Sequence, residues 1–290
     1  HCVTRRQRQM CIRDRSIAGT GKYDADGTFD ATGATVTFTG DGRLECASTV
    51  TSLGTLNTSS GTVEYDGGTQ SVIEDTYYNL EIDQSGTKTA AGNLSIDGNL
   101  VLTGGELDFN GGQDINLKGN LTKTSGSLVN SSSTNGYLVL QGTSGTQAID
   151  AINDQEISIK VSDDANVTVN GNISANYLWL QSSNTGTFLI GGWAVSLDDK
   201  IVVDGGTLQI TSGSLNTSKN SSSVHELDGG TIDIDGGTVN IGYATNNTAD
   251  LNITSGTIDI SDGTLNVSDC IDMSGGCLLY TSPSPRDLRK

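Results

Sequence analysis

Two pairs of adjacent aspartates are the sharpest candidates for chemistry in this sequence. Asp163 and Asp164 lie in VSDDANV, and Asp198 and Asp199 lie in SLDDK. Neighbouring carboxylates can bind Ca²⁺ or act as an acid–base pair, but aspartate is also a preferred turn residue. Neither pair is followed by an EF-hand loop or by a calcium-binding GGxGxDxΦx repeat. We therefore expect solvated turns, with weak Ca²⁺ binding as the alternative and no resident cofactor.

The two tryptophans, Trp179 and Trp193, are candidates for surface recognition. Trp179 alternates with Leu178 and Leu180 in NYLWLQSS, and this period of two predicts that its ring points away from the core. An aromatic ring exposed on a flat face could contact a sugar or another surface.

An enzyme would need further groups. A glycosidase requires two carboxylates about 5–10 Å apart in a groove, and a lyase requires a Lys or Arg base beside carboxylates. His225 lies in VHELDGG without a partner motif, and we interpret it as an outward-facing strand residue. We therefore assign no catalytic residue.

The charge of the chain argues against nucleic acid as a partner. The sequence has 34 Asp and Glu against 16 Lys and Arg, a formal net charge of −18. Residues 16–276 carry eight basic and 32 acidic residues, so their net charge is −24. Phosphate binding requires a basic surface, whereas strong acidity attracts cations. Cys46 and Cys270, the cysteines of this stretch, are too few for a disulfide framework or a metal cluster.

The two ends differ from the middle in composition. Residues 1–15 contain CIRDR and residues 277–290 contain LLYTSPSPRD, and both stretches resemble translated read-through of sequencing adapters. The resemblance implies non-native tails at 1–15 and 277–290. We expect residues 16–276 to form one domain, a fragment of a longer repeat region with flanking domains.

An internal repeat dominates the C-terminal third of the chain. Residues 203–218, 227–242 and 253–268 align, and Gly-rich turns separate short alternating segments within each copy. Each copy therefore predicts three short strands. Aligned apolar positions form three columns: Val203, Leu227 and Ile253; Leu208, Ile232 and Ile258; and Leu215, Val239 and Leu265.

Strands this short cannot bury an apolar face alone, but stacked copies share a continuous core. The sequence therefore predicts an all-β fold, a single-stranded parallel β-helix (β-solenoid). We expect a right-handed helix from the crossover preference of parallel strands. About ten coils of roughly 20–26 residues would give a rod of about 50 Å. Helices should be nearly absent, because no stretch shows a convincing helical period.

The same alignment predicts columns of polar side chains on the outside of the rod. Asp233 would stack between Gln209 and Asp259, and because like charges opposite one another repel, we expect weak binding of Ca²⁺ or Na⁺ there. Two other columns would contain Asn216, Asn240 and Asn266, which can hydrogen-bond along the stack, and Thr207, Thr231 and Thr257.

A longer repeat lies upstream. Residues 62–82 and 137–159 align at a spacing of 77, so that Gln70 corresponds to Gln147 and Leu80 corresponds to Ile157. A unit of this length predicts a duplicated block of about three coils.

Residues 61–105 resemble a block found in very large secreted surface proteins of Bacteroidota and related bacteria. The resemblance is carried by SGTKT at 85–89 and by Gly61, Thr62, Val63, Tyr65, Gln70, Tyr78, Asn79 and Leu80. It implies an adhesin-like β-solenoid that is extracellular or lies at the cell surface.

We therefore expect a structural and adhesive role without catalysis, as a stalk or display surface that binds glycans or other surfaces. Insertion into a membrane is not expected. Two alternatives remain: a carbohydrate-active β-helix enzyme, either a polysaccharide lyase or a hydrolase, and a segment of a phage tail spike or fibre. A lateral groove that combines carboxylates, a Lys or Arg and aromatic rings would favour the enzyme.

Overall fold

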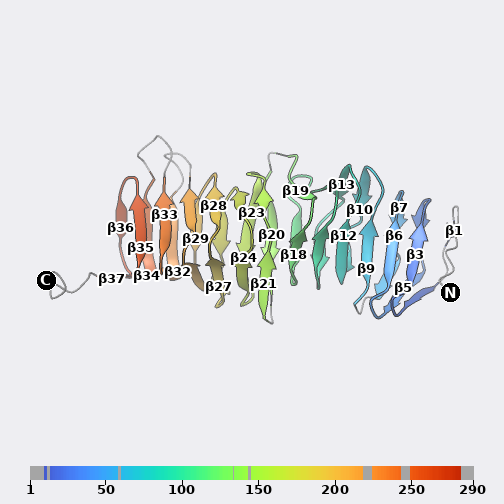
Figure 1. The fold of residues 1–290 in the computed structure, drawn as a ribbon, viewed down its shortest axis with the longest axis horizontal. Coiled ribbons are helices and arrows are strands. Elements are labelled where there is room, and N and C mark those ends of the chain that lie inside the picture. The colour runs from blue at the N-terminus through green and yellow to red at the C-terminus, as the bar shows by residue number, and fades with distance from the viewer. Residues whose placement is uncertain are drawn as a thin grey trace, which may run out of the picture.

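The computed structural model describes residues 10–11, 14–57, 60–132, 134–142, 145–217, 224–242 and 249–281. Within these residues every regular element is a β-strand and no helix is present. The strands lie across a long rod, and the chain runs from one end of the rod to the other (Figure 1). The predicted all-β parallel β-helix is therefore confirmed. None of the described residues belongs to a helix that is long and apolar enough to cross a membrane.

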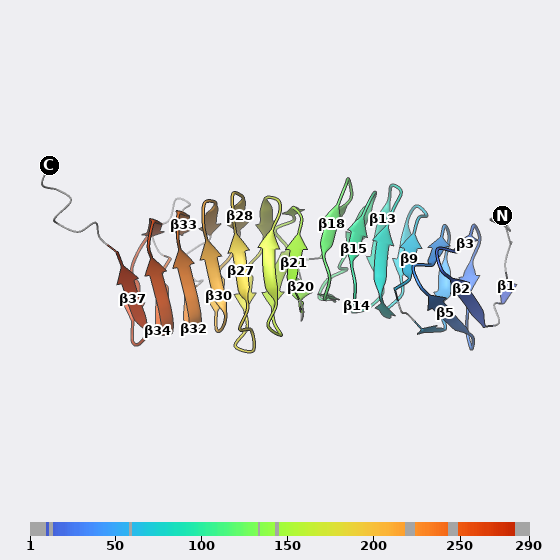
Figure 2. The ribbon, with the colours of Figure 1, turned by 60° about the horizontal axis from the view of Figure 1, so that its bottom comes forward.

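Each coil contributes strands to three parallel ladders, which we call the first, second and third faces (Figure 2). The first face contains β3 (Lys22–Ala25), β6 (Arg43–Cys46), β9 (Thr62–Tyr65), β12 (Asn79–Ile82), β15 (Leu100–Leu102), β18 (Leu121–Lys123), β21 (Thr146–Ile149), β24 (Asn166–Val169), β27 (Thr187–Ile190), β30 (Thr207–Ile210), the second halves of β32 (His225–Ile234) and β34 (Leu251–Ile260), and β37 (Cys277–Tyr280). The second face contains β2 (Arg15–Ala18), β5 (Thr35–Thr39), β8 (Thr55–Asn57), β11 (Thr76–Tyr77), β14 (Leu94–Ile96), β17 (Asp114–Leu117), β20 (Gly136–Leu140), β23 (Ile157–Val161), β26 (Leu178–Leu180), β29 (Ile201–Val203), the first halves of β32 and β34, and β36 (Ile271–Met273).

The third face contains β1 (Met10–Cys11), β4 (Phe29–Asp30), β7 (Val50–Ser52), β10 (Gln70–Val72), β13 (Thr87–Ala90), β16 (Glu106–Asp108), β19 (Ser127–Val129), β22 (Ile152–Asn153), β25 (Ile173–Ala175), β28 (Ala194–Leu197), β31 (Ser214–Thr217), β33 (Gly237–Ile241) and β35 (Gly263–Val267). Backbone pairing along the first face is continuous, whereas the second and third faces are divided into separate sheets. The first face is therefore the backbone ladder that joins the whole rod.

The rod has more coils than expected, because many coils are shorter than the C-terminal repeat suggests. Twelve parallel pairings join the successive strands of the first face, from β3 to β37. The step along the chain is shortest between Thr62 and Asn79 and longest between Leu121 and Ile149, so its length is not constant. About twelve coils, rather than about ten, correspond to a length of roughly 58 Å.

The three inward columns predicted from the repeat are confirmed by the strand register. Val203 pairs with Leu227, which pairs with Ile253, and the other two columns are equally in register. Inward side chains form one buried apolar cluster that extends from Ile17 to Ile260. Each coil contacts only its neighbours, so the stability of the rod is distributed along this shared core.

A buried glutamine holds one corner of the rod. Gln70 Nε2 donates to the carbonyl oxygens of Cys46 and Ser48 at 2.8 and 2.5 Å, and Gln70 Oε1 accepts from the amide of Gly67 at 2.8 Å. A Cβ atom at Gly67 would lie 2.4 Å from the carbonyl oxygen of Ala47, so this close approach requires glycine. The side chain of Gln70 thus ties the corner of its own coil to that of the preceding coil.

Gln147 makes the same set of bonds in the second copy of the longer repeat. Its Nε2 donates to the carbonyl oxygens of Leu117 and Gly119 at 2.9 and 2.5 Å, and its Oε1 accepts from the amide of Gly142 at 3.3 Å. The two blocks start eleven strands apart, at β9 and β20. With three strands in each coil, the repeat unit is therefore three and two-thirds coils rather than about three. Consequently the second copy starts on the second face, whereas the first copy starts on the first face.

Strand pairing extends into both segments that the sequence set apart as tails. Arg15 begins β2, which pairs with β5, and β37 pairs with Thr257–Ile260 of β34. The side chains of β37 are exposed, because no described strand packs beyond it.

Candidate functional site

The paired aspartates form turns at two different corners of the rod. Asp163 and Asp164 have left-handed backbone conformations, with φ of 55° and 61°, between β23 and β24. The carboxylate of Asp164 accepts hydrogen bonds from the amide and hydroxyl of Thr185 in the next coil, at 3.1 and 2.6 Å. Asp198 and Asp199 lie between β28 and β29, where their amides donate to carbonyl oxygens of the preceding coil. The structure does not bring the two pairs together.

Asp233 lies in the predicted outward column, between Gln209 and Asp259. Gln209 Nε2 donates to Asp233 Oδ2 and Asp235 Oδ2 at 3.0 and 3.1 Å, and Ser261 Oγ donates to Asp235 Oδ1 at 2.6 Å. Partial burial, followed by the carboxylates of Asp235 and Asp259, raises the pKa of Asp233. Asp235 was not predicted to join this acidic group, because a turn separates it from the strand.

The asparagine and threonine columns are confirmed. Asn240 Nδ2 donates to Asn216 Oδ1 at 2.7 Å, and Asn266 Nδ2 donates to Asn240 Oδ1 at 2.8 Å. The threonines at the equivalent position of β30, β32 and β34 are in register. The amide ladder links successive coils on the third face.

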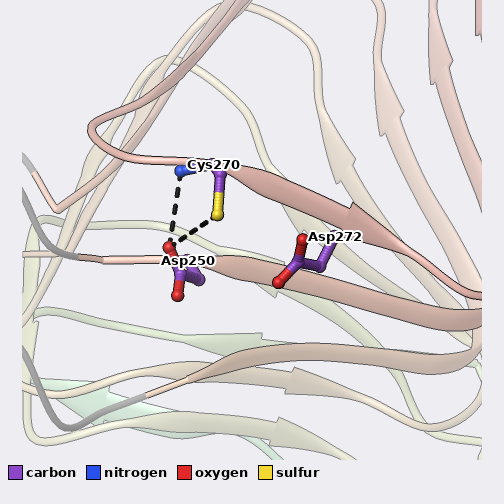
Figure 3. Close-up of side chains that lie close together, drawn as sticks. All are labelled: Asp250, Cys270 and Asp272. Carbon is purple, nitrogen blue, oxygen red and sulfur yellow. Dashed lines mark hydrogen bonds between the residues drawn. The ribbon is translucent and has the colours of Figure 1, made fainter.

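Among the described residues, one group brings three possible metal-ligating atoms within 4.8 Å of one another: Asp250, Cys270 and Asp272 (Figure 3). The amide and thiol of Cys270 both donate to Asp250 Oδ1, at 3.4 and 3.1 Å. The hydrogen bond from the thiol to Asp250 raises the pKa of Cys270 to about 11, whereas metal binding requires a thiolate. The thiol of Cys270 is therefore protonated at neutral pH, and a metal that bound here would have to displace its proton.

His225 is buried, so its interpretation as an outward residue is wrong. It pairs with Leu251 in the next strand and has 0% exposure. Nδ1 accepts a hydrogen bond from the amide of Ile201 at 3.2 Å, and Nε2 lies 3.4 Å from Thr217 Oγ1. Burial lowers the pKa of His225 to about 4, which keeps it neutral. The sequence contains a signal for this burial, because side chains alternate along a strand and His225 precedes the inward Leu227 by two residues. Both side chains therefore point to the same side.

A ladder of glutamates on the outside of the first face was not predicted. Glu45, Glu64 and Glu81 are opposite one another in successive strands, and the first two have only 7% and 6% exposure. Arg43 Nη1 lies 2.5 Å from Glu64 Oε2 and Nη2 lies 2.7 Å from Glu81 Oε2, while Lys22 pairs with Glu45. Burial raises the pKa of Glu64 to about 7, against the opposing effect of Arg43, and Glu81 and Glu45 add to the rise. The C-terminal repeat does not include these residues, and the upstream alignment compares residues 62–82 with 137–159 and not with the neighbouring coils.

An aromatic patch lies on the second face, formed by Tyr137, Lys160, Tyr177 and Trp179 on or beside β20, β23 and β26. Trp179 faces outward as predicted, opposite Lys160, while the flanking leucines are buried. Its Nε1 donates to Asp204 Oδ2 at 2.8 Å. Lys160 Nζ lies 5.2 Å from the centre of the Trp179 ring and 5.8 Å from that of Tyr137, within the range of cation–π attraction.

The two tyrosines of the patch meet above the strand that lies between them. Their rings pack edge to face with centroids 5.9 Å apart, and their hydroxyls are 3.2 Å apart. Burial, and then the hydrogen bond with Tyr137, raises the pKa of Tyr177. The hydroxyl of Tyr177 therefore stays protonated, and a tyrosine hydroxyl can donate or accept hydrogen bonds.

A polar hollow of about 430 Å³ lies on the same face, and Val139 separates it from Lys160 of the patch. Its lining includes Ser95 and Asn116, which occupy the same outward column as Val139, Lys160 and Trp179. Lys118 and Asp97 also line the hollow and form an ion pair of 2.7 Å. The outward column of the second face therefore changes from small polar side chains at Ser95 and Asn116 to a large aromatic one at Trp179.

Trp193 lies elsewhere. It is 43% exposed and occupies the corner between β27 and β28, where the first face meets the third. The structure therefore does not combine the two tryptophans into one platform.

Searches against protein-family models, curated proteins and solved structures find no match to this chain.

Proposed function

We propose that this protein is a non-catalytic adhesive rod, a stalk or display surface that works outside a bacterial cell and binds glycans. The observation that carries this proposal is the single apolar core that extends from Ile17 to Ile260 under three ladders. Such a stack resists bending, because every coil is joined to its neighbours by backbone hydrogen bonds and by buried side chains. A rod of this kind can hold a binding surface away from its point of attachment.

The distribution of chemical groups favours binding over hydrolysis. In a glycosidase, two carboxylates flank the bond that breaks, and aromatic rings hold the sugar beside them. Here the glutamate ladder lies on the first face and Arg43 or Lys22 engages its carboxylates, whereas the aromatic patch lies on the second face. The two sets of groups therefore do not serve one bound sugar.

A glycan array probed beside a polysaccharide-degradation assay tests this proposal. We expect the protein to be retained on at least one glycan without releasing new reducing ends or unsaturated products. Release of such products would establish the enzyme alternative, and loss of the release in Glu64→Gln would assign it to the glutamate ladder. A stable trimer in solution, measured by light scattering, would favour the tail-spike alternative.

A further inference from the structure

The aromatic patch is built as two adjacent columns on the outside of the second face. One column contains Val139, Lys160 and Trp179 in successive strands. In the other, Tyr137 is opposite Ser158, and the amide of Ile159 donates to the carbonyl oxygen of Tyr177 at 2.8 Å. Tyr137 and Tyr177 thus flank Ser158, one in each neighbouring coil.

The tyrosines lean over Ser158. Their strands are two steps apart, which corresponds to roughly 9.6 Å between backbones, yet the ring centroids are only 5.9 Å apart. Ser158 consequently has 0% exposure although its side chain points outward, between inward Ile157 and Ile159. The tyrosine pair is a cover over this serine.

The hydroxyl of Ser158 has no hydrogen-bond partner among the described residues. A buried polar atom without a partner costs roughly 1–3 kcal/mol, so the few that occur in a folded protein call for an explanation. To reach Ser158, a ligand hydroxyl must displace the contact between the two tyrosine hydroxyls, and it would then hydrogen-bond with Ser158 and with both tyrosines.

We propose that the aromatic patch, with Ser158 at its floor, is the binding site of a neutral glycan that runs along the second face into the polar hollow. One sugar ring stacks on Trp179 while Lys160 donates to its hydroxyls, and neighbouring sugars occupy the hollow beside Asn116. This inference rests on the proposed function, because it names the face and the ligand class that the adhesive rod uses.

The net charge of the protein favours a neutral over an acidic chain, whereas Lys160 alone would accept either. No acidic side chain of the described residues forms an ion pair with Lys160, but its three N–H donors suit hydroxyl oxygens as well as carboxylates. Asp204 is held against Trp179, and Lys200 is already paired with Glu226 at 3.0 Å. The net charge of the chain is −18, so a polyanion would be repelled.

The test measures binding of the full chain to soluble xylan, mannan, β-glucan and starch, with alginate as the anionic comparison. Affinity electrophoresis and calorimetry report the dissociation constants at low and high salt. We expect at least one neutral polysaccharide to bind with little dependence on salt. Binding to alginate alone, lost at high salt, would overturn the neutral class.

Two variants locate the site. Trp179→Ala should weaken binding roughly tenfold or more, as loss of an aromatic anchor does, and Ser158→Ala should weaken it about fivefold while leaving the fold intact. Trp193→Ala is the matched control, since it removes a tryptophan that lies away from the second face, at the corner between β27 and β28, and its affinity should equal that of the original chain. Circular dichroism and the melting temperature check folding in each case.

The outcomes separate this inference from the broader proposal. Binding that persists unchanged in both Trp179→Ala and Ser158→Ala would overturn the site while the adhesive role stands. Failure of the original chain to bind any of the neutral polysaccharides would overturn the ligand class. The stalk role would then depend on the glycan array and degradation assay alone.

Discussion

His225 links the stability of the rod to pH through one buried side chain. Burial lowers its pKa from 6.5 to about 4 in the folded state. A lowered pKa means that the unfolded chain binds the proton more readily, so stability present above pH 6.5 is lost as the pH falls towards 4. The full loss is about 3 kcal/mol.

Replacing His225 by leucine, the residue type of its neighbour Leu251, should remove this acid sensitivity. The variant leaves the amide of Ile201 without its acceptor, which costs roughly 1–3 kcal/mol at all pH values. Urea denaturation at a series of pH values between 4 and 8 measures both effects. An unchanged dependence on pH between 4 and 6.5 would show that His225 is not its source.

The acidic column around Asp233 should destabilise the rod at neutral pH. Its pKa is raised first by partial burial and then by repulsion from Asp235 and Asp259, so these costs are present above the folded-state pKa and are relieved as the pH falls. Asp233→Asn should therefore raise the free energy of unfolding at pH 7 by roughly 0.2–1 kcal/mol, with no gain at low pH.

The same variant tests weak cation binding. If Ca²⁺ binds along this column, added Ca²⁺ at fixed ionic strength raises the melting temperature of the original chain but not that of Asp233→Asn. Asp262→Asn, at an exposed turn in the next coil, is the control for loss of one charge. If added Ca²⁺ leaves the melting temperatures of all three proteins unchanged, Ca²⁺ does not bind along this column.

At the scale of elements, the buried side chains of Gln70 and Gln147 each join the corners of neighbouring coils. Gln147→Ala would leave two carbonyl oxygens and one amide without their buried partner, and we expect a loss of roughly 2–4 kcal/mol. Gln155→Ala, at an exposed position, should change stability by less than about 0.5 kcal/mol. Chemical denaturation measures the free energy of unfolding of both variants. Equal losses would show that the hydrogen bonds of Gln147 do not stabilise the rod.

The glutamate ladder should give the opposite dependence on pH to His225. The folded-state pKa of Glu64, about 7, lies above its ordinary value of 4.5. Stability therefore falls as the pH rises through this interval, and Glu64→Gln should remove the fall and raise stability at pH 8 by about 1–3 kcal/mol. Arg43 keeps Glu81 as a partner in this variant. A loss of stability at pH 8 would show that the ion pair with Arg43 outweighs the cost of burial.

At the scale of the whole molecule, the rod should respond to damage locally. Leu44 and Ile232 are both buried on the first face and lie nine strand steps apart, in β6 and β32. Leu44→Ala and Ile232→Ala should each cost roughly 2–5 kcal/mol of local stability and should be additive within about 0.5 kcal/mol. Hydrogen exchange should increase only in the coils beside each substitution, because contacts do not reach further. Uniform exchange along the rod would contradict this picture.

Much of this fold could be predicted because its rules are local. Alternation within short strands and glycines at the corners indicate the β-helix, and one aligned repeat placed Leu208 opposite Ile232 and Asn216 opposite Asn240. The same alternation also placed Trp179 on the outside. His225 is the exception, because a histidine is expected at the surface by residue type, whereas its position in the strand places it in the core.

The candidate site could not be predicted in the same way, because it depends on which coils become neighbours. The steps within one ladder range from the short one that ends at Asn79 to the long one that ends at Ile149, so the register upstream of the C-terminal repeat follows no constant period. Tyr137 reaches Tyr177 across 40 residues, and Arg43 reaches Glu81 across 38. These contacts exist only once stacking fixes the register, since burial of the core across neighbouring coils, and not any local pattern, selects which side chains meet.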